Sequence, residues 1–176
     1  MPGYVIHIAV ANEYIRKNNL RNPEEFIRGV IAPDDVEDKS LTHYGKYSSR
    51  TNLKQYLDAN EINTDFDKGY FLHLLTDYLF YNYYFITPRT VMFYQDYDRT
   101  NQELILKYHV QLPERLQKFA NCNNEEEPEI LKIDELEKMI DEISDLDLEK
   151  SEREIKNTET ITIGNKTIET NVFRRY

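Results

Sequence analysis

The segment YFLHLLTDYLFYNYYF, residues 70–85, sets His73 and Asp77 among large apolar and aromatic side chains. These two residues are four apart, and positions i and i+4 of an α-helix lie on the same face, about one turn apart. An imidazole and a carboxylate that converge suit zinc or a similar divalent ion, and a carboxylate inside an aromatic helix needs a cation or a hydrogen-bond donor. Spacing alone leaves two interpretations open: a metal site, or an ordinary contact in the helical core.

Two further histidines have settings that fit a metal site. His7 lies in the apolar segment VIHIAVA near the start of the chain, and His43 follows Asp34 by nine residues in a polar stretch. A site built from these residues would draw its ligands from separate parts of the chain, so the fold must bring them together.

The elements that would position these side chains are predicted to be helices joined by short loops. Capping residues and prolines mark their limits, as at Asn22-Pro23, where a helix starts, and at Ala32-Pro33, where it stops. The predicted helices cover about 5–17, 23–32, 52–57, 65–85, 89–108, 113–120 and 133–143, and residues 34–50 are predicted to be a loop.

The charge and the composition divide the chain into three segments. The net charge is -10, and residues 121–154, with fourteen acidic and four basic residues, account for all of that excess. We therefore expect a helical metal-binding body over 1–120 and an acidic segment with one amphipathic helix over 121–154. Over 155–176 we expect a tail, in which ETITIGNKTIET predicts a β-hairpin. An isolated hairpin is marginal, so the tail must pack on the body or on a second subunit, and it is a candidate surface for homo-oligomers.

The composition limits the classes of function that this chain can have. No apolar stretch reaches the roughly 18 residues of a transmembrane helix, the N-terminal residues lack the pattern of a secretory signal, and the one cysteine, Cys122, cannot form an internal disulfide. We therefore expect a cytoplasmic protein. The chain also lacks a basic stripe, so nucleic acid is not an expected partner.

Four short motifs, in order, resemble a known family. GYVIHIAVANEYI, FIRGVIAPDD, THYG and FLHLLTDYLFY are similar to segments of the zinc-dependent phospholipase C superfamily, which also includes the fungal single-strand nucleases. The likeness covers about the first 85–110 residues. It implies a mostly α fold, a multi-helix phospholipase C-like bundle, to which this chain adds the small C-terminal β-hairpin.

The resemblance also implies a set of ligands. In that family such residues surround up to three zinc ions, and here the metal-ligand roles fall to five residues: His7, Asp34, His43, His73 and Asp77. Asp34 and Asp77 would be the catalytic carboxylates, with Asp77 shared between ions. Asp35 is an alternative to Asp34, because two adjacent acids cannot be told apart from sequence.

The departures from the family pattern reduce the expected number of ions. The chain has no Trp, whereas phosphodiesterases of the family use a mature N-terminal Trp. Tyr83 stands where a further histidine is expected, and the fourth position after His109, where the family has an acid, is Pro113. The ligands of one ion are nearly complete and those of a second are partial, so we expect one or two zinc ions.

Two functions remain as hypotheses. The first is a metal-dependent phosphoester hydrolase of the phospholipase C-like class, with a metal-bound water as nucleophile and a small phosphoester or lipid head group as substrate. The alternative is a catalytically degenerate member of the family that keeps a structural metal or binds a partner.

Overall fold

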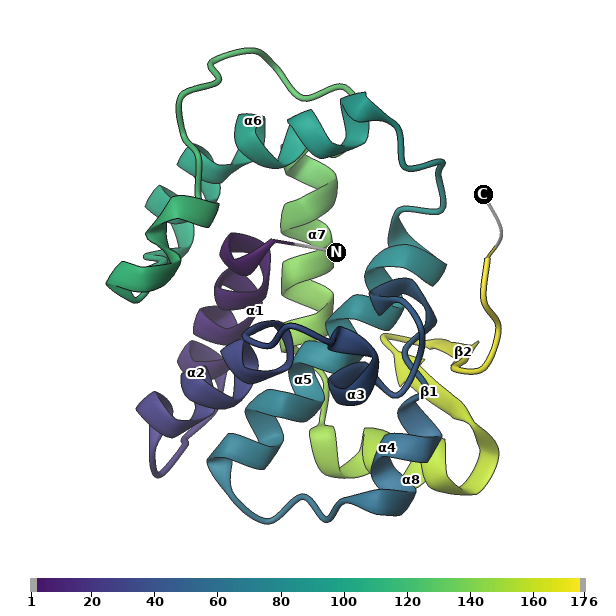
Figure 1. The fold of residues 1–176 in the computed structure, drawn as a ribbon. Helices are drawn as coiled ribbons and strands as arrows, with labels where there is room; N and C mark the ends of the chain where they lie inside the picture. The colour runs from purple at the N-terminus through teal and green to yellow at the C-terminus, as the bar shows by residue number, and fades with distance from the viewer. Residues whose placement is uncertain (1–2, 175–176) are drawn as a thin grey trace.

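The computed structural model describes residues 3–174 and has a mostly α-helical fold with a small C-terminal hairpin (Figure 1), as predicted. The α-helices are α1 (Tyr4–Lys17), α2 (Pro23–Ile31), α3 (Lys39–His43), α4 (Leu53–Ala59), α5 (Asp65–Leu79), α6 (Val91–Tyr108), α7 (Ile133–Ser144) and α8 (Leu148–Thr158). The strands are β1 (Thr160–Ile163) and β2 (Lys166–Glu169). Short helical turns occupy Ala32–Asp34, Ser48–Arg50 and Glu114–Phe119, and a π-helical turn occupies Phe80–Tyr84.

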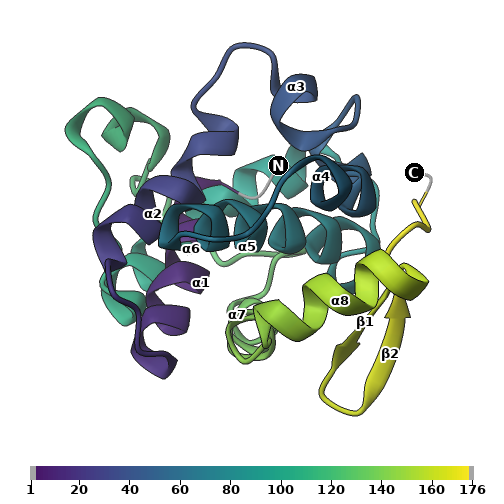
Figure 2. The same cartoon turned by 90° about the horizontal axis from the view of Figure 1, so that it is seen from below.

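Helix α5 is the central element of the fold, as Figure 2 shows. It begins at a capping box, in which the Thr64 side chain accepts from the Asp67 amide and the Asp67 side chain accepts from the Thr64 amide. From Phe71 to Leu79 every side chain is buried, because neighbouring elements cover this helix on all sides. The polar residues His73 and Asp77 are therefore held inside the core.

The helices α2 and α5 cross at two facing glycines. A Cβ on Gly69 would lie 3.0 Å from the amide nitrogen of Val30 and closer still to the carbonyl oxygen of Phe26. A Cβ on Gly29 would in the same way meet the carbonyl oxygen of Phe66. Only glycine allows two helix backbones to approach this closely, and the crossing sets the end of α2 against His73.

The predicted loop over residues 34–50 is partly helical, which corrects that prediction. Asp38 caps α3 by accepting from the Ser40 amide, and Ser48–Arg50 form a 3₁₀ turn. Elements of three to five residues are too short for a hydrophobic period to appear. The hydroxyl of Thr42 donates to the carbonyl of Pro33 at 2.7 Å, which ties α3 to the turn after α2.

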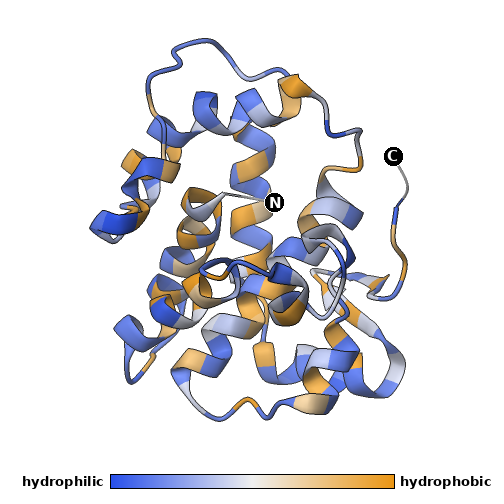
Figure 3. Ribbon diagram, viewed as in Figure 1, coloured by the Kyte–Doolittle hydropathy of each residue, from blue (hydrophilic) through white to orange (hydrophobic). Residues whose placement is uncertain are grey.

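The acidic segment contributes to the core. In α7 the residues Leu136, Met139, Ile140 and Ile143 are buried, and this helix packs on α1. Figure 3 shows the resulting alternation of hydrophobic and hydrophilic bands along α7. Helix α8 was not predicted, and it crosses the boundary placed between residues 154 and 155; its short buried stripe is Leu148, Ser151 and Ile155.

The C-terminal hairpin packs on the body of the same chain. Within residues 3–174 strands occur only in the tail, as predicted, and Ile161 and Ile163 of β1 are buried. The Tyr78 hydroxyl of α5 donates to the carbonyls of Glu169 and Val172, each at 2.8 Å. The tail is therefore an integral part of this subunit, and homo-oligomer formation through it stays a prediction.

Among residues 3–174, no helix has both the length and the apolar content needed to span a membrane.

Candidate metal centre

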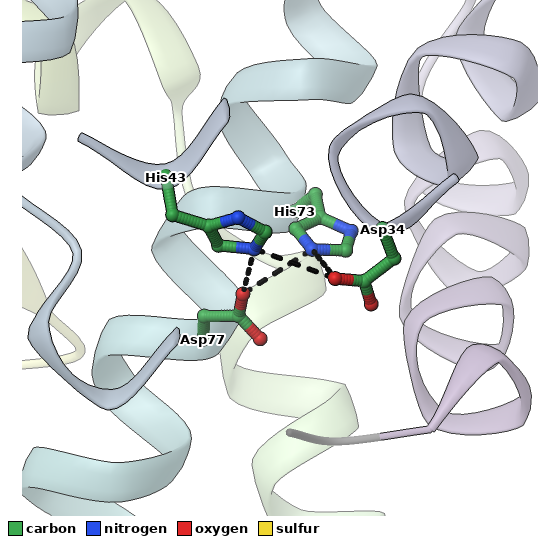
Figure 4. Close-up of side chains that lie close together, drawn as sticks. All are labelled: Asp34, His43, His73 and Asp77. Carbon is green, nitrogen blue, oxygen red and sulfur yellow. Dashed lines mark ion pairs between the residues drawn. The ribbon is translucent and has the colours of Figure 1, made fainter. Parts of the chain in front are cut away.

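Four side chains from three elements converge at one point, which we call the metal centre: Asp34, His43, His73 and Asp77. One nitrogen or oxygen atom from each lies within 4.8 Å of the others, and Figure 4 shows the four side chains pointing toward one another. Asp34 comes from the turn after α2, His43 from the end of α3, and His73 and Asp77 from α5. All four side chains are fully buried, with 0% exposure. This buried cluster could hold a metal ion.

Backbone contacts orient both imidazoles of the metal centre. Nδ1 of His73 lies 2.7 Å from the carbonyl oxygen of Val30, and Nδ1 of His43 lies 3.0 Å from that of Lys39. A carbonyl oxygen can only accept, so each Nδ1 carries the hydrogen. Each Nε2 therefore points into the centre and, when the ring is neutral, offers a lone pair to a metal ion.

The converging atoms have no hydrogen-bond partners in the described structure. They are both carboxylate oxygens of Asp34, Nε2 of His43, Nε2 of His73 and Oδ2 of Asp77. The Nε2 atoms of His43 and His73 approach Asp77 Oδ2 at 2.9 and 3.2 Å, but without hydrogen-bond geometry. Buried polar atoms are rarely left unsatisfied, because each costs about 1–3 kcal/mol. A divalent cation at this point could accept one converging atom from each of the four residues as a ligand.

The electrostatics of the metal centre favour a positive charge. Burial alone raises the pKa of Asp77, but His73 and His7 outweigh it and hold the pKa well below its ordinary value. Burial lowers the pKa of His73, but Asp34 and Asp77 outweigh it and raise that pKa to about 10. Without an ion, the proton on His73 supplies a positive charge that the two buried carboxylates require.

His7 lies directly behind the metal centre and contacts one of its ligands. Its Nε2 is 3.0 Å from Asp77 Oδ1, whereas Oδ2 of the same carboxylate faces the centre. The His7 ring stacks on His73, with centroids 3.7 Å apart and planes 5° apart. Burial and the neighbouring His73 both lower the pKa of His7, which favours a neutral ring that donates to Asp77. In this arrangement His7 orients a ligand and is not among the four converging residues.

The structure distinguishes Asp34 from Asp35. Asp34 is buried in the metal centre, whereas Asp35 is exposed and pairs with Arg115 at 2.7 Å. The two residues that depart from the family pattern both lie elsewhere. Tyr83 lines a surface hollow with Glu135 and Lys138, and His109 is an exposed C-cap of α6 with a φ of 54°.

One polar residue near the metal centre was missed by sequence reasoning. Lys39 places its Nζ 3.4 Å from Asp34 Oδ1. Its signal in the sequence is the four-residue spacing to His43, which puts both side chains on one face of α3.

Comparisons with known proteins give no relative for this chain: no family model matches it, and no curated protein or solved structure is significantly similar. The resemblance to the zinc-dependent phospholipase C superfamily therefore stays an interpretation of the four motifs.

Proposed function

We propose that this protein binds a zinc ion with Asp34, His43, His73 and Asp77 and uses it to hydrolyse a phosphoester. The observation that carries the proposal is the convergence of buried nitrogen and oxygen atoms that have no hydrogen-bond partner. Two imidazoles and two carboxylates suit zinc better than magnesium or calcium, which prefer oxygen ligands alone.

The roles of the residues follow from their contacts. When bound, a zinc ion supplies Lewis acidity that polarises a phosphoryl oxygen and lowers the pKa of water. Asp34 and Asp77 would balance the charge of the ion, and His7 would hold the Asp77 carboxylate in place through Oδ1. The carbonyls of Val30 and Lys39 would hold the two imidazoles. A small phosphoester or a lipid head group is the proposed substrate, because an acidic chain without a basic stripe is poorly suited to nucleic acid.

Complete burial of the ligands favours a second candidate function. Structural zinc sites have four protein ligands and are closed, whereas catalytic sites keep an open position for water or substrate. The four side chains are 0% exposed, which fits an ion that joins α3 and the end of α2 to α5. In that case the protein is a degenerate member of its class and acts by binding a partner.

Metal analysis tests the part that both candidates share. Protein purified without chelator should contain about one zinc per chain, and a His73→Ala, Asp77→Ala double variant should contain none. His109→Ala is the matched control, because this exposed histidine lies outside the metal centre. Equal, near-zero zinc in the parent and the double variant, also after refolding with zinc, would refute both candidates.

Hydrolysis assays separate the two candidates. If the centre is catalytic, turnover of a generic phosphodiester or phosphomonoester should rise with zinc occupancy and disappear in Asp77→Asn. If zinc is structural, chelation should lower the unfolding temperature strongly, and the zinc-loaded protein should show no turnover on lipid, nucleotide or small phosphoester substrates.

A further inference from the structure

The four ligands of the metal centre are covered by the fold, so an ion can reach them only when a covering element moves. Their side chains are 0% exposed. Asp34, His73 and Asp77 lie in α5 or at the end of α2, and these two helices are in close contact at the glycine crossing. His43 lies in the segment 35–47, which contains α3 and which we call the α3 flap. Figure 2 shows α3 projecting from the helical body.

The α3 flap has little hydrophobic anchoring of its own. Between residues 35 and 47, His43 is the only buried residue. Tyr44 packs half-buried against the core. Three other large side chains of the flap are 41–75% exposed: Val36, Leu41 and Tyr47. Because burial of apolar surface is the main term that holds an element in place, little free energy keeps the flap closed.

Polar contacts hold the flap in its closed position. The Thr42 hydroxyl donates to the Pro33 carbonyl at 2.7 Å, and the Tyr70 hydroxyl of α5 donates to the Thr42 carbonyl at 2.9 Å. Further contacts are the hydrogen bond from Asn60 to the Tyr44 hydroxyl and the ion pairs Lys39–Asp34 and Asp35–Arg115. Single hydrogen bonds and ion pairs of partly exposed side chains each contribute little to stability.

The chain is fixed on both sides of the flap. Before it, Pro33 and Asp34 are buried. After it, Ser48 and Ser49 are buried, and the Ser49 carbonyl accepts from the Asn82 side chain at 2.9 Å. A segment that is fixed at its ends and weakly held between them can open locally while the rest of the protein stays folded. Such an opening would move His43 away from α5.

We propose that the α3 flap is the gate of the metal centre: it opens to admit the ion, and the bound ion holds it closed through His43. This inference rests on the proposed zinc site and deepens it, since it states how the ion enters and leaves. In the closed flap, Nε2 of His43 lies 2.9 Å from Asp77 Oδ2. An ion held by His43 and by the ligands of α5 therefore joins the flap to the core, and the flap opens only when the ion loses a ligand.

Hydrogen exchange measures the opening directly. In the metal-free protein, the amides of the flap should exchange roughly tenfold or more faster than those of residues 71–79, which are all buried in α5. Zinc should slow the exchange of the flap about a hundredfold when free zinc is about 100 times its Kd, because the open flap lacks one ligand. In His43→Ala, zinc should leave the exchange of the flap unchanged, since the ion no longer contacts it.

The kinetics of zinc transfer test the gate without an assay of turnover. Tyr70→Phe removes the bond to the Thr42 carbonyl but no ligand, so it should ease opening equally with and without zinc. The rate of zinc uptake and the rate of zinc release to excess chelator should both rise roughly two- to tenfold, and the Kd should stay the same. Tyr47→Phe is the matched control, because this exposed tyrosine of the flap loses the same hydroxyl, and its rates should equal those of the parent.

Several results would overturn the gate. One is a metal-free protein in which the flap exchanges as slowly as α5, and another is a flap whose exchange does not respond to bound zinc. A weaker Kd in Tyr70→Phe with an unchanged rate of uptake would also overturn it, because Tyr70 would then support the ligands and not the closed flap. Tight zinc binding beneath a rigid flap would leave the metal centre standing, whereas a protein that binds no zinc would refute both the gate and the metal centre.

Discussion

The glycine crossing of α2 and α5 can be tested with one added methyl group. In Gly69→Ala the new Cβ would lie 3.0 Å from the amide nitrogen of Val30 and closer to the carbonyl oxygen of Phe26, whereas ordinary contacts of a Cβ begin at 3.4 Å. Both neighbours are backbone atoms of α2, so no side chain can turn aside to relieve the contact. The two helices must move apart.

The cost of that movement can be estimated from three effects. Overpacking a core costs about 1–3 kcal/mol, and loss of the buried bond from His73 to the Val30 carbonyl costs about 1–3 kcal/mol more. Alanine recovers about 1 kcal/mol over glycine in a helix. We therefore expect Gly69→Ala to lower the free energy of unfolding by about 3 kcal/mol, or the melting temperature by about 6–12 °C for a chain of this size.

The same movement should weaken zinc binding, because α2 leads directly into Asp34 whereas His73 belongs to α5. Urea unfolding and zinc titration of the purified variant measure the two effects. Gly3→Ala is the control, since a Cβ there meets nothing within 4 Å. Gly29→Ala should behave like Gly69→Ala, and the double variant should lose less than the sum, because one separation of the helices relieves both contacts. A Gly69→Ala protein as stable as the parent, with unchanged zinc affinity, would refute this reasoning.

Three further predictions concern single contacts. His7→Phe keeps a ring against His73 but removes the donor to Asp77 Oδ1. Zinc affinity should therefore fall about ten- to a hundredfold, while the number of zinc ions per chain stays the same. If the variant instead loses one of two ions, His7 is a direct ligand. Zinc binding at pH 7 should release about one proton, because the pKa of His73 is raised to about 10 in the metal-free protein. Calorimetry in buffers of different ionisation enthalpy measures this release, and a result of no released proton would mean that the His73 ring is already neutral. Asp96 is buried, which raises its pKa, but its carboxylate accepts from the amides of residues 129–131, and these bonds outweigh burial and lower the pKa. The Asp96 carboxylate therefore stabilises the fold above the unfolded pKa of about 3.9, and this stabilisation is lost as the pH falls through the lower pKa of the folded protein. Asp96→Asn should therefore cost about 1–3 kcal/mol at pH 7 and reduce the acid-side loss of stability in urea melts, and an unchanged acid profile would contradict the role of Asp96.

The histidine and aspartate of α5 could be predicted to converge because their spacing alone determines it. His73 and Asp77 are one helical turn apart, and a long helix of this composition is a strong signal in sequence. Their two partners could be proposed only from the order of the motifs, since Asp34 and His43 reach α5 through tertiary packing. The close crossing at Gly29 and Gly69, which performs that packing, leaves no periodic pattern in the sequence.

The choice between Asp34 and Asp35 shows where sequence reasoning stops. Both are acids after the same proline, and only the 3₁₀ turn at Ala32–Asp34 turns the first inward and leaves the second to pair with Arg115. His7 is a related case. A direct ligand and a residue that orients a ligand both require a histidine on the inner face of α1, so the sequence cannot separate these roles.

The arrangement around Asp77 favours a single ion. Oδ1 of Asp77 is engaged by His7 at 3.0 Å and only Oδ2 faces the metal centre, so a bridge through both oxygens would have to displace His7. A second ion would have to displace the hydrogen of His7 Nε2 and find further ligands nearby. The two positions at which the proposed resemblance would place such ligands hold Tyr83, which lines a separate hollow, and the exposed His109. If the proposed site binds zinc, we therefore expect one ion per chain, with His7 holding the Asp77 carboxylate through Oδ1.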